Sequence, residues 1–157
     1  MITNTTQQVS FKTYFQNQYV TISYNEEERL GKAEWNGQLQ GAEYREALLL
    51  CQGAIDQFGL TKWLGDNRKM KAILKEDEAW TISVLCPLLL NSTLCRMANL
   101  VSKNLINRKA VERMIKHAET QKELIFCDFE TEEEALEWLR ASLDTETKAI
   151  VTAYSNA

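Results

Sequence analysis

The stretch LTKWLGDNR at residues 60–68 decides the predicted fold of this chain. Its first half, Leu60–Leu64, is mostly apolar, and it ends in the acidic, amide and basic triplet Asp66-Asn67-Arg68. This order is typical of a buried central strand whose carboxyl end opens into a loop, which is where α/β sheets form their sites. We therefore expect a central strand at Leu60–Leu64 and a loop from the triplet to Lys75.

Three strands are predicted before this stretch. Residues 9–16 and Tyr19–Tyr24 read as two strands joined by a tight turn at Asn17-Gln18. In the second of them, apolar side chains alternate with polar ones, which predicts one buried face. A third strand is expected at Leu30–Trp35, closed by Asn36-Gly37.

The hydrophobic period then changes to that of a helix. From about residue 40 to Phe58, apolar residues recur at spacings of four and three, so one stripe should pack against the sheet. Gly59 follows and predicts a left-handed helix end. The residues of this stripe are Tyr44, Leu48, Cys51, Ile55 and Phe58.

After the central strand, helices and strands are expected to alternate. The predicted elements are a helix over 76–91, a strand over 94–102, a helix over 107–119, a strand over 124–129 and a helix that opens at Thr131. Pro87 should kink or end the first of these helices, because proline lacks the N–H that would bond to the Ser83 carbonyl. Asn107 is expected to cap the second, and Thr131 opens a capping box with Glu134.

This order of elements predicts an α/β fold. An antiparallel start that leads into right-handed β-α crossovers gives a mixed central sheet of five or six strands, flanked by about four helices. Leu60–Leu64 and Met97–Val101 are expected at its centre. At 157 residues the chain is predicted to be one domain, with a core at about 9–141 and terminal extensions at 1–8 and 144–157.

The composition argues against several classes of protein. A net charge of -4 and a pI near 5.2 do not suit a general nucleic-acid binder, which must neutralise phosphates. The longest apolar run, Val84–Leu90, is too short to span a bilayer, and residues 1–8 lack the pattern of a signal peptide. Four scattered cysteines and one histidine favour a reduced, cytoplasmic protein without a zinc site.

Several segments, taken in their order along the chain, resemble the STAS-like family of bacterial proteins. The segments are Trp35, the helix over Tyr44–Phe58, the strand end Gly65-Asp66-Asn67-Arg68, Trp80 with Pro87, the strand Met97–Ser102 and the closing motif EALEWL at 134–139. Members of this family are similar to the sporulation anti-sigma-factor antagonist and related in fold to lipid-binding CRAL-TRIO domains. The likeness covers roughly residues 18–141. It implies a regulatory protein, although the loop that carries the family's phosphorylated Ser or Thr has no hydroxyl group over residues 66–71.

The resemblance and the residues together favour a non-enzymatic module that binds a protein partner. The residues expected to contact the partner are Asp66, Asn67, Arg68, Lys69 and Lys71. The simpler alternative for Asp66 is that its carboxylate bonds loop amides or pairs with Arg68. We expect no enzymatic activity, metal or cofactor, because catalysis needs polar groups that converge on a pocket.

The second interpretation is a carrier of a small apolar, lipid-like molecule, as in the lipid-binding relatives. Its pocket would lie between the sheet and the second helix, opened by the kink at Pro87. The residues expected to line it are Trp80, Val84, Leu85, Leu88 and Leu89. Both a monomer and a homodimer are compatible with the sequence.

Overall fold

The computed structural model describes residues 10–119 and 124–141. The predicted terminal extensions at 1–8 and 144–157 lie outside these residues. Within the described part of the chain, no helix is both long enough and apolar enough to cross a membrane.

Within the described residues, one mixed sheet of six strands forms the centre of the fold, and its strands lie side by side in chain order. The first two strand pairs are antiparallel and the remaining three are parallel. The predicted α/β fold with a mixed sheet is therefore confirmed. The strands are β1 Lys12–Gln16, β2 Val20–Asn25, β3 Leu30–Gly37, β4 Lys62–Met70, β5 Arg96–Leu100 and β6 Ile125–Phe129.

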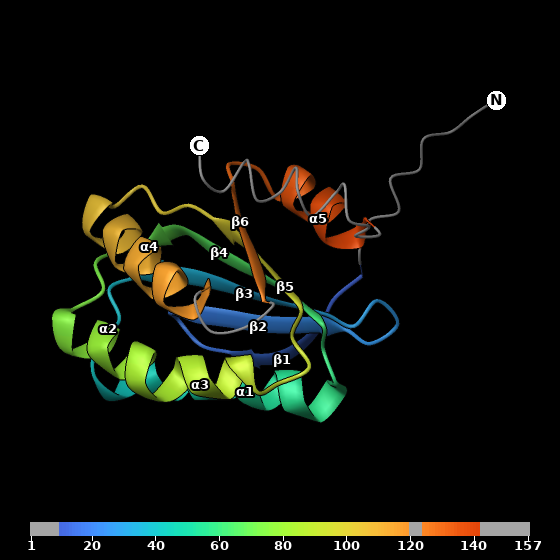
Figure 1. Ribbon diagram of the computed structural model, residues 1–157, viewed down its shortest axis with the longest axis horizontal. Coiled ribbons are helices and arrows are strands. Elements are labelled where there is room, and N and C mark those ends of the chain that lie inside the picture. Colours follow the sequence, from blue (N-terminus) through green and yellow to red (C-terminus); the bar gives the residue numbers. More distant parts are fainter. Residues whose placement is uncertain (1–9, 120–123, 142–157) are drawn as a thin grey trace.

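The helices cover both faces of this sheet unequally (Figure 1). Successive right-handed crossovers that all advance in one direction leave their helices on the same face. Three helical segments accordingly lie on one face, while the helix that follows β6 packs against β4 and β5 on the other. The helices are α1 Ala42–Phe58, the continuous segment α2 Lys75–Trp80, η1 Thr81–Leu85 and α3 Cys86–Leu90, then α4 Leu105–Glu119 and α5 Glu132–Arg140.

Two apolar cores result from this arrangement. The larger one lies between the sheet and α1, η1–α3 and α4. The smaller one lies under α5, and its buried members are Leu30, Leu64, Ala98, Leu100, Ala135 and Leu139. Leu64 contributes to the smaller core and Trp63 to the larger, because successive strand residues point to opposite faces.

Two helices end or begin as the sequence predicts. Gly59 is left-handed, with φ 57°, and its N–H donates to the Ile55 carbonyl at the end of α1. The Thr131 hydroxyl accepts a hydrogen bond from the Glu134 N–H at the start of α5. The predicted cap at Asn107 is wrong. Asn104 accepts from the Asn107 N–H instead, so α4 begins two residues before the predicted cap.

The prediction of a loop from Asp66 to Lys75 is also wrong. β4 continues through that region and stays paired with β3 as far as Gly37 opposite Met70. Polar side chains do not prevent this, because the ladder uses main-chain groups and β3 is long enough to supply them. One extra residue in β4 shifts the register between Asp66 and Lys69, and only residues 71–74 connect β4 to α2.

Pro87 acts by a different route from the predicted kink or stop. The five residues before Cys86 form a π-helical turn, in which the Cys86 N–H donates to the Thr81 carbonyl, and the helix then continues to Leu90. The wider turn accommodates the missing N–H of proline and its ring. A π turn also rotates the helix face, because it holds more residues than an α-helical turn.

Candidate functional site

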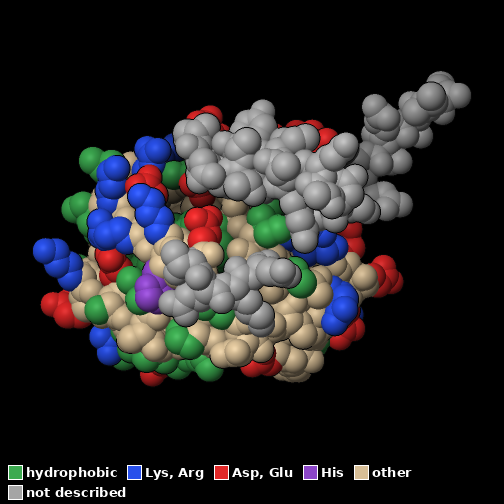
Figure 2. All heavy atoms as spheres, viewed as in Figure 1, with side chains coloured by type: hydrophobic (Ala, Val, Ile, Leu, Met, Phe, Trp, Pro, Cys, Tyr) green, Lys and Arg blue, Asp and Glu red, His purple; other side chains and the backbone are tan. Residues whose placement is uncertain are grey.

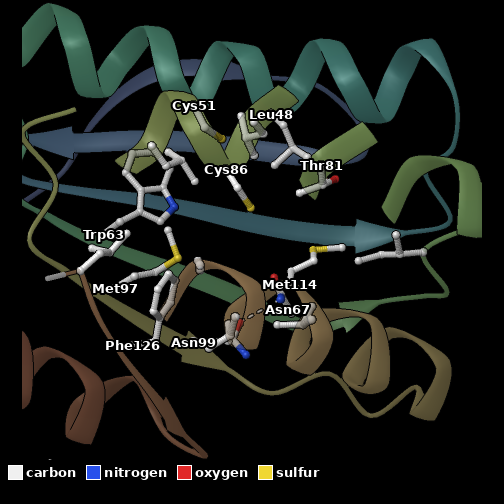
Figure 3. A pocket seen from close by; sticks show the side chains of 18 of the residues that line it. Leu48, Cys51, Trp63, Asn67, Thr81, Cys86, Met97, Asn99, Met114 and Phe126 are labelled. Atoms are coloured by element: carbon white, nitrogen blue, oxygen red, sulfur yellow. Dashed lines mark hydrogen bonds between the residues drawn. The ribbon is translucent and has the colours of Figure 1, made fainter. Parts of the chain in front are cut away.

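A cavity of about 140 Å³ lies inside the larger core, between the sheet and the three helical segments on that face. Its walls are almost entirely apolar. Trp63, Met97 and Phe126 come from three parallel strands, Leu48 from α1 and Met114 from α4 (Figure 3). The cavity thus collects side chains from at least five elements of the chain.

Two local features leave this space open. Gly65 lies on the cavity side of β4, and a Cβ placed there would meet no atom closer than 3.8 Å. The π turn brings Thr81, Leu85 and Cys86 toward the cavity from the opposite wall. A strand residue without a side chain and a widened helical turn therefore face each other across the space.

Asn67 and Asn99 supply the polar side of the cavity. They come from the neighbouring strands β4 and β5 and lie together (Figure 3). The Asn67 Nδ2 donates to the Asn99 Oδ1 at 2.9 Å, and the Asn99 Nδ2 donates to the Asp128 Oδ1 at 3.2 Å. Burial raises the pKa of Asp128. This row of side chains across β4, β5 and β6 holds both amides in a fixed orientation.

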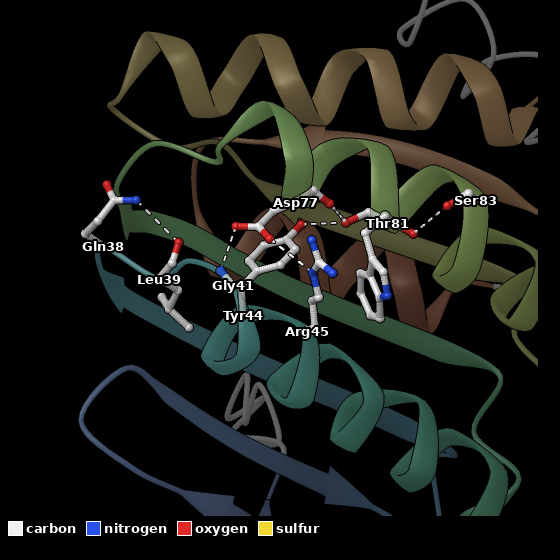
Figure 4. Close-up of polar contacts among 9 residues, drawn as sticks. Gln38, Leu39, Gly41, Tyr44, Arg45, Asp77, Thr81 and Ser83 are labelled. Carbon is white, nitrogen blue, oxygen red and sulfur yellow. Dashed lines mark hydrogen bonds and ion pairs between the residues drawn. The ribbon is translucent and has the colours of Figure 1, made fainter.

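A second polar group next to the cavity is internally satisfied (Figure 4). The Thr81 hydroxyl donates to the Asp77 carbonyl at 2.7 Å, so the Tyr44 hydroxyl must be the donor in its 2.8 Å contact with Thr81. The Asp77 carboxylate, 2% exposed, accepts from the Gly41 N–H and from Arg45. These bonds fasten α1 to α2, and they leave Asn67 and Asn99 as the groups suited to a ligand.

The cavity thiols are poor nucleophiles. Burial raises the pKa of both Cys51 and Cys86, so they remain protonated at neutral pH. Among the described residues that line the cavity, none carries a charge. Across residues 10–119 and 124–141, no three His, Cys, Asp or Glu side chains gather in a group that could hold a metal ion.

The five residues predicted to contact a partner do not form one surface. Asp66 and Arg68 point to the face of the sheet that α5 covers in part, whereas Asn67 is buried on the cavity side. Lys69 and Lys71 are exposed near the end of β4. The predicted set is divided because its first members belong to a strand, in which alternate side chains point in opposite directions.

Asp66 and Arg68 form the ion pair that was the simpler alternative. The Arg68 Nε and Nη2 donate to the two carboxylate oxygens at 2.9 and 2.8 Å, and the Arg68 N–H donates at 3.2 Å. Burial raises the pKa of Asp66, but the hydrogen bonds from Arg68 outweigh it, and the pKa is lowered. Arg68 therefore holds Asp66 in place as a carboxylate.

A cavity lies between the sheet and the second helix, where the alternative pocket was expected, but of the five residues expected to line it only Leu85 and Leu89 do so. Val84 and Leu88 are 40% and 42% exposed. Trp80 packs edge-on against Tyr44, outside the cavity lining. The prediction assumed one α-helical face throughout, and the π turn rotates that face away.

Asn99 was missed by the reasoning from sequence. A usable signal was present, because Asn67 and Asn99 each fall on the same face of their strand as the apolar residues Trp63 and Met97. An amide on the apolar face of two neighbouring strands marks a polar position inside a core. From α4, the residues that line the cavity are Val111, Met114, Ile115 and Ala118.

No protein-family model matches this chain, and no curated protein sequence matches it. Its fold is similar to the solved structure of an uncharacterized protein from the DUF3478 family, with a SpoIIAA-like fold, from Shewanella loihica PV-4. The two chains are 19% identical with a TM-score of 0.48, over 83% of this chain and 92% of that one. At this identity and score, the likeness concerns the fold and assigns no function.

Proposed function

We propose that this protein is a non-enzymatic binding protein for a small, neutral and largely apolar molecule that carries one hydrogen-bonding group. The ligand would occupy the cavity between the sheet and α1, η1–α3 and α4. The observation that carries the proposal is an apolar cavity with an oriented amide pair, Asn67 and Asn99, on one side. Apolar walls with a few placed polar groups are typical of sites for small molecules.

The volume of the cavity limits the size of the ligand. A dry cavity of about 150 Å³ holds one benzene molecule in another protein. The cavity here, at about 140 Å³, suits a molecule with a single ring or a short branched chain. The lipid-like ligand expected from the sequence must therefore be much smaller than a fatty acyl chain.

The chemistry of the lining limits the charge of the ligand. Asn67 and Asn99 offer neutral amide donors and acceptors, and the lining contains no charged side chain that could balance an ion. Burying an unpaired ion would cost far more free energy than these amides return. Phenol, which has one ring and one hydroxyl, is therefore a suitable probe, and benzene is its matched apolar control.

A protein-interaction module is the second interpretation, and it has less support. Its predicted residues are divided between two faces of the sheet, and Asp66 and Arg68 are already paired with each other. Absence of catalysis remains part of our proposal. It is supported by the protonated state of Cys51 and Cys86, which makes both thiols weak nucleophiles.

Titration calorimetry with phenol and benzene tests the proposal. An aromatic ring removes about 200 Å² from water, which contributes roughly 5 kcal/mol and corresponds to a Kd on the order of 0.2 mM. A hydrogen bond to Asn67 or Asn99 should strengthen phenol binding by roughly fivefold over benzene. Asn67→Leu, which also removes the donor that orients the Asn99 amide, should abolish this preference while benzene still binds.

A variant that fills the cavity provides the decisive comparison. Val111 lines the cavity from α4, so Val111→Phe should weaken binding of both probes by about tenfold or more. Lys116→Phe, an exposed position on the same helix, is the matched control and should bind both probes like the wild type. The proposal is refuted if neither probe binds the wild type, or if Val111→Phe binds both with unchanged affinity.

A further inference from the structure

Two segments meet at the edge of the sheet where β4 and β5 end. The Ser102 hydroxyl donates to the Met70 carbonyl at 2.7 Å, and the Asn107 side chain donates to the Lys71 carbonyl at 2.8 Å. Both donor residues are buried, so the segments 69–75 and 102–109 form one fixed surface, which we name the basic pole. In Figure 1 it lies at the left end of the molecule, where α2 and α4 begin.

The basic pole has a charge opposite to that of the whole chain. Its two segments contain six basic residues and no acidic residue, whereas the chain carries a net charge of -4. All six are exposed, and Figure 2 shows Lys and Arg side chains gathered at this end of the molecule. They are Lys69, Lys71, Lys75, Lys103, Arg108 and Lys109.

Acidic groups next to the pole are mostly engaged elsewhere. Glu78 is paired with Arg113 at 2.6 Å, and buried Asp77 accepts from Arg45. Lys109 has an exposed partner, Glu112, at 3.6 Å, and Glu76 is exposed beside Lys75. The pole therefore keeps an excess of positive charge.

Apolar side chains project from the middle of this positive surface. Leu105 and Ile106, in the first turn of α4, are 62% and 60% exposed, the highest values among the large hydrophobic residues that the structure describes. Leu74, at the start of α2, is 37% exposed. Isolated exposed leucines are ordinary on protein surfaces. Two adjacent ones between Lys103 and Arg108 suit a partner that is both apolar and anionic.

We propose that the basic pole docks on an anionic membrane surface. Leu105 and Ile106 would enter the boundary between headgroups and acyl chains, and the six cations would lie among the phosphate and carboxylate headgroups. A nucleic acid would match the lysines but not the two apolar side chains. This proposal concerns the outer surface, so it holds whether or not the cavity takes a ligand.

Vesicle sedimentation with the full chain tests the proposal. The wild type should sediment with phosphatidylcholine vesicles that contain about 30% phosphatidylserine, and not with pure phosphatidylcholine. Raising the salt from about 0.1 M to about 0.5 M should release most of the bound protein. Equal binding to both kinds of vesicle, or none to either, overturns the proposal.

Matched variants separate the charged from the apolar contribution. Lys71→Glu with Lys103→Glu should weaken binding to anionic vesicles by about tenfold or more, while Lys116→Glu should stay within about twofold of the wild type. Leu105→Ser with Ile106→Ser should weaken it by about fivefold or more. Leu49→Ser, at a position 43% exposed on α1, is its control and should bind like the wild type.

Two outcomes with these variants would overturn the proposal. One is vesicle binding that survives the double charge reversal, with circular dichroism showing that the variant is folded. The other is binding to a DNA duplex, rather than to vesicles, that is insensitive to Leu105→Ser with Ile106→Ser. The second result would make the pole a purely electrostatic site for polyanions.

Discussion

Gly31→Ala should destabilise the protein strongly, because the indole of Trp63 occupies the space of the missing side chain. A Cβ at Gly31 would lie 2.2 Å from the Trp63 Cζ3 and 2.8 Å from the Leu60 Cδ1. Since ordinary contact begins at 3.4 Å, the indole would have to move by about 1.2 Å. Trp63 and Leu60 are 4% and 0% exposed, so their neighbours oppose that movement.

The magnitude follows from two opposing effects. Overpacking a core by one methyl group costs about 1–3 kcal/mol, and a rigid buried indole places this site near the upper limit. Replacing glycine in a strand returns roughly 0.5–1 kcal/mol of conformational entropy. We expect a net loss of about 2 kcal/mol, which lowers the Tm by roughly 4–8 °C in a chain of this length.

Gly65→Ala is the matched control in the neighbouring strand, where Gly65 pairs with Ala33. Its added Cβ would meet the Asn99 Oδ1 at 3.8 Å, which is ordinary contact. This variant should gain roughly 0.5–1 kcal/mol of stability and should bind phenol more weakly, because the methyl group enters the cavity. Urea unfolding followed by circular dichroism measures both changes in stability. A stable Gly31→Ala variant, or a Gly65→Ala variant destabilised by more than about 1 kcal/mol, would contradict the packing described here.

Three further predictions concern polar and thiol groups. Arg68→Ala should cost at most about 1 kcal/mol at pH 7, since the Arg68 side chain is 40% exposed and water screens its ion pair with Asp66. Because Arg68 lowers the pKa of Asp66, this cost should vanish as the pH falls through that lowered pKa, which urea titrations at acid and neutral pH would show. Asp77→Ala should cost roughly 2–3 kcal/mol in urea unfolding, because it leaves the Gly41 N–H without its acceptor, and Asp77→Asn should cost less. Cys95, the exposed cysteine, should react first with a thiol reagent, and the three buried cysteines should react only when urea unfolds the chain. Rapid modification of all four cysteines in the folded protein would contradict this burial.

Periodicity was sufficient to predict the layers of this fold. The alternating strands before Trp35, the helical stripe of α1 and the left-handed Gly59 all depend on local interactions, and the structure confirms them. The end of β4 could not be predicted from residues 66–70 themselves. Their strand conformation depends on main-chain partners in β3, which are distant in sequence.

The candidate site was predictable only in its general position. The sequence placed an apolar pocket beside the second helix, but the lining residues depend on a π turn at Thr81–Leu85. That turn arises from Pro87 together with packing against α1 and α4, so periodicity alone selects the wrong face. The amide pair likewise requires knowledge that β4 and β5 are neighbours, which brings Asn67 and Asn99 into contact.

The chain order of the six strands has a consequence for biosynthesis. Each strand pairs with the one made just before it, so no later strand has to be inserted between two that are already joined. The face formed by Leu30, Leu64, Ala98 and Leu100, however, acquires its cover only when α5 has left the ribosome. A product truncated before residue 132 would display this uncovered apolar face, which is the kind of surface that chaperones and proteases recognise. The arrival of α5 thereby marks the point at which this apolar face of the sheet is no longer exposed.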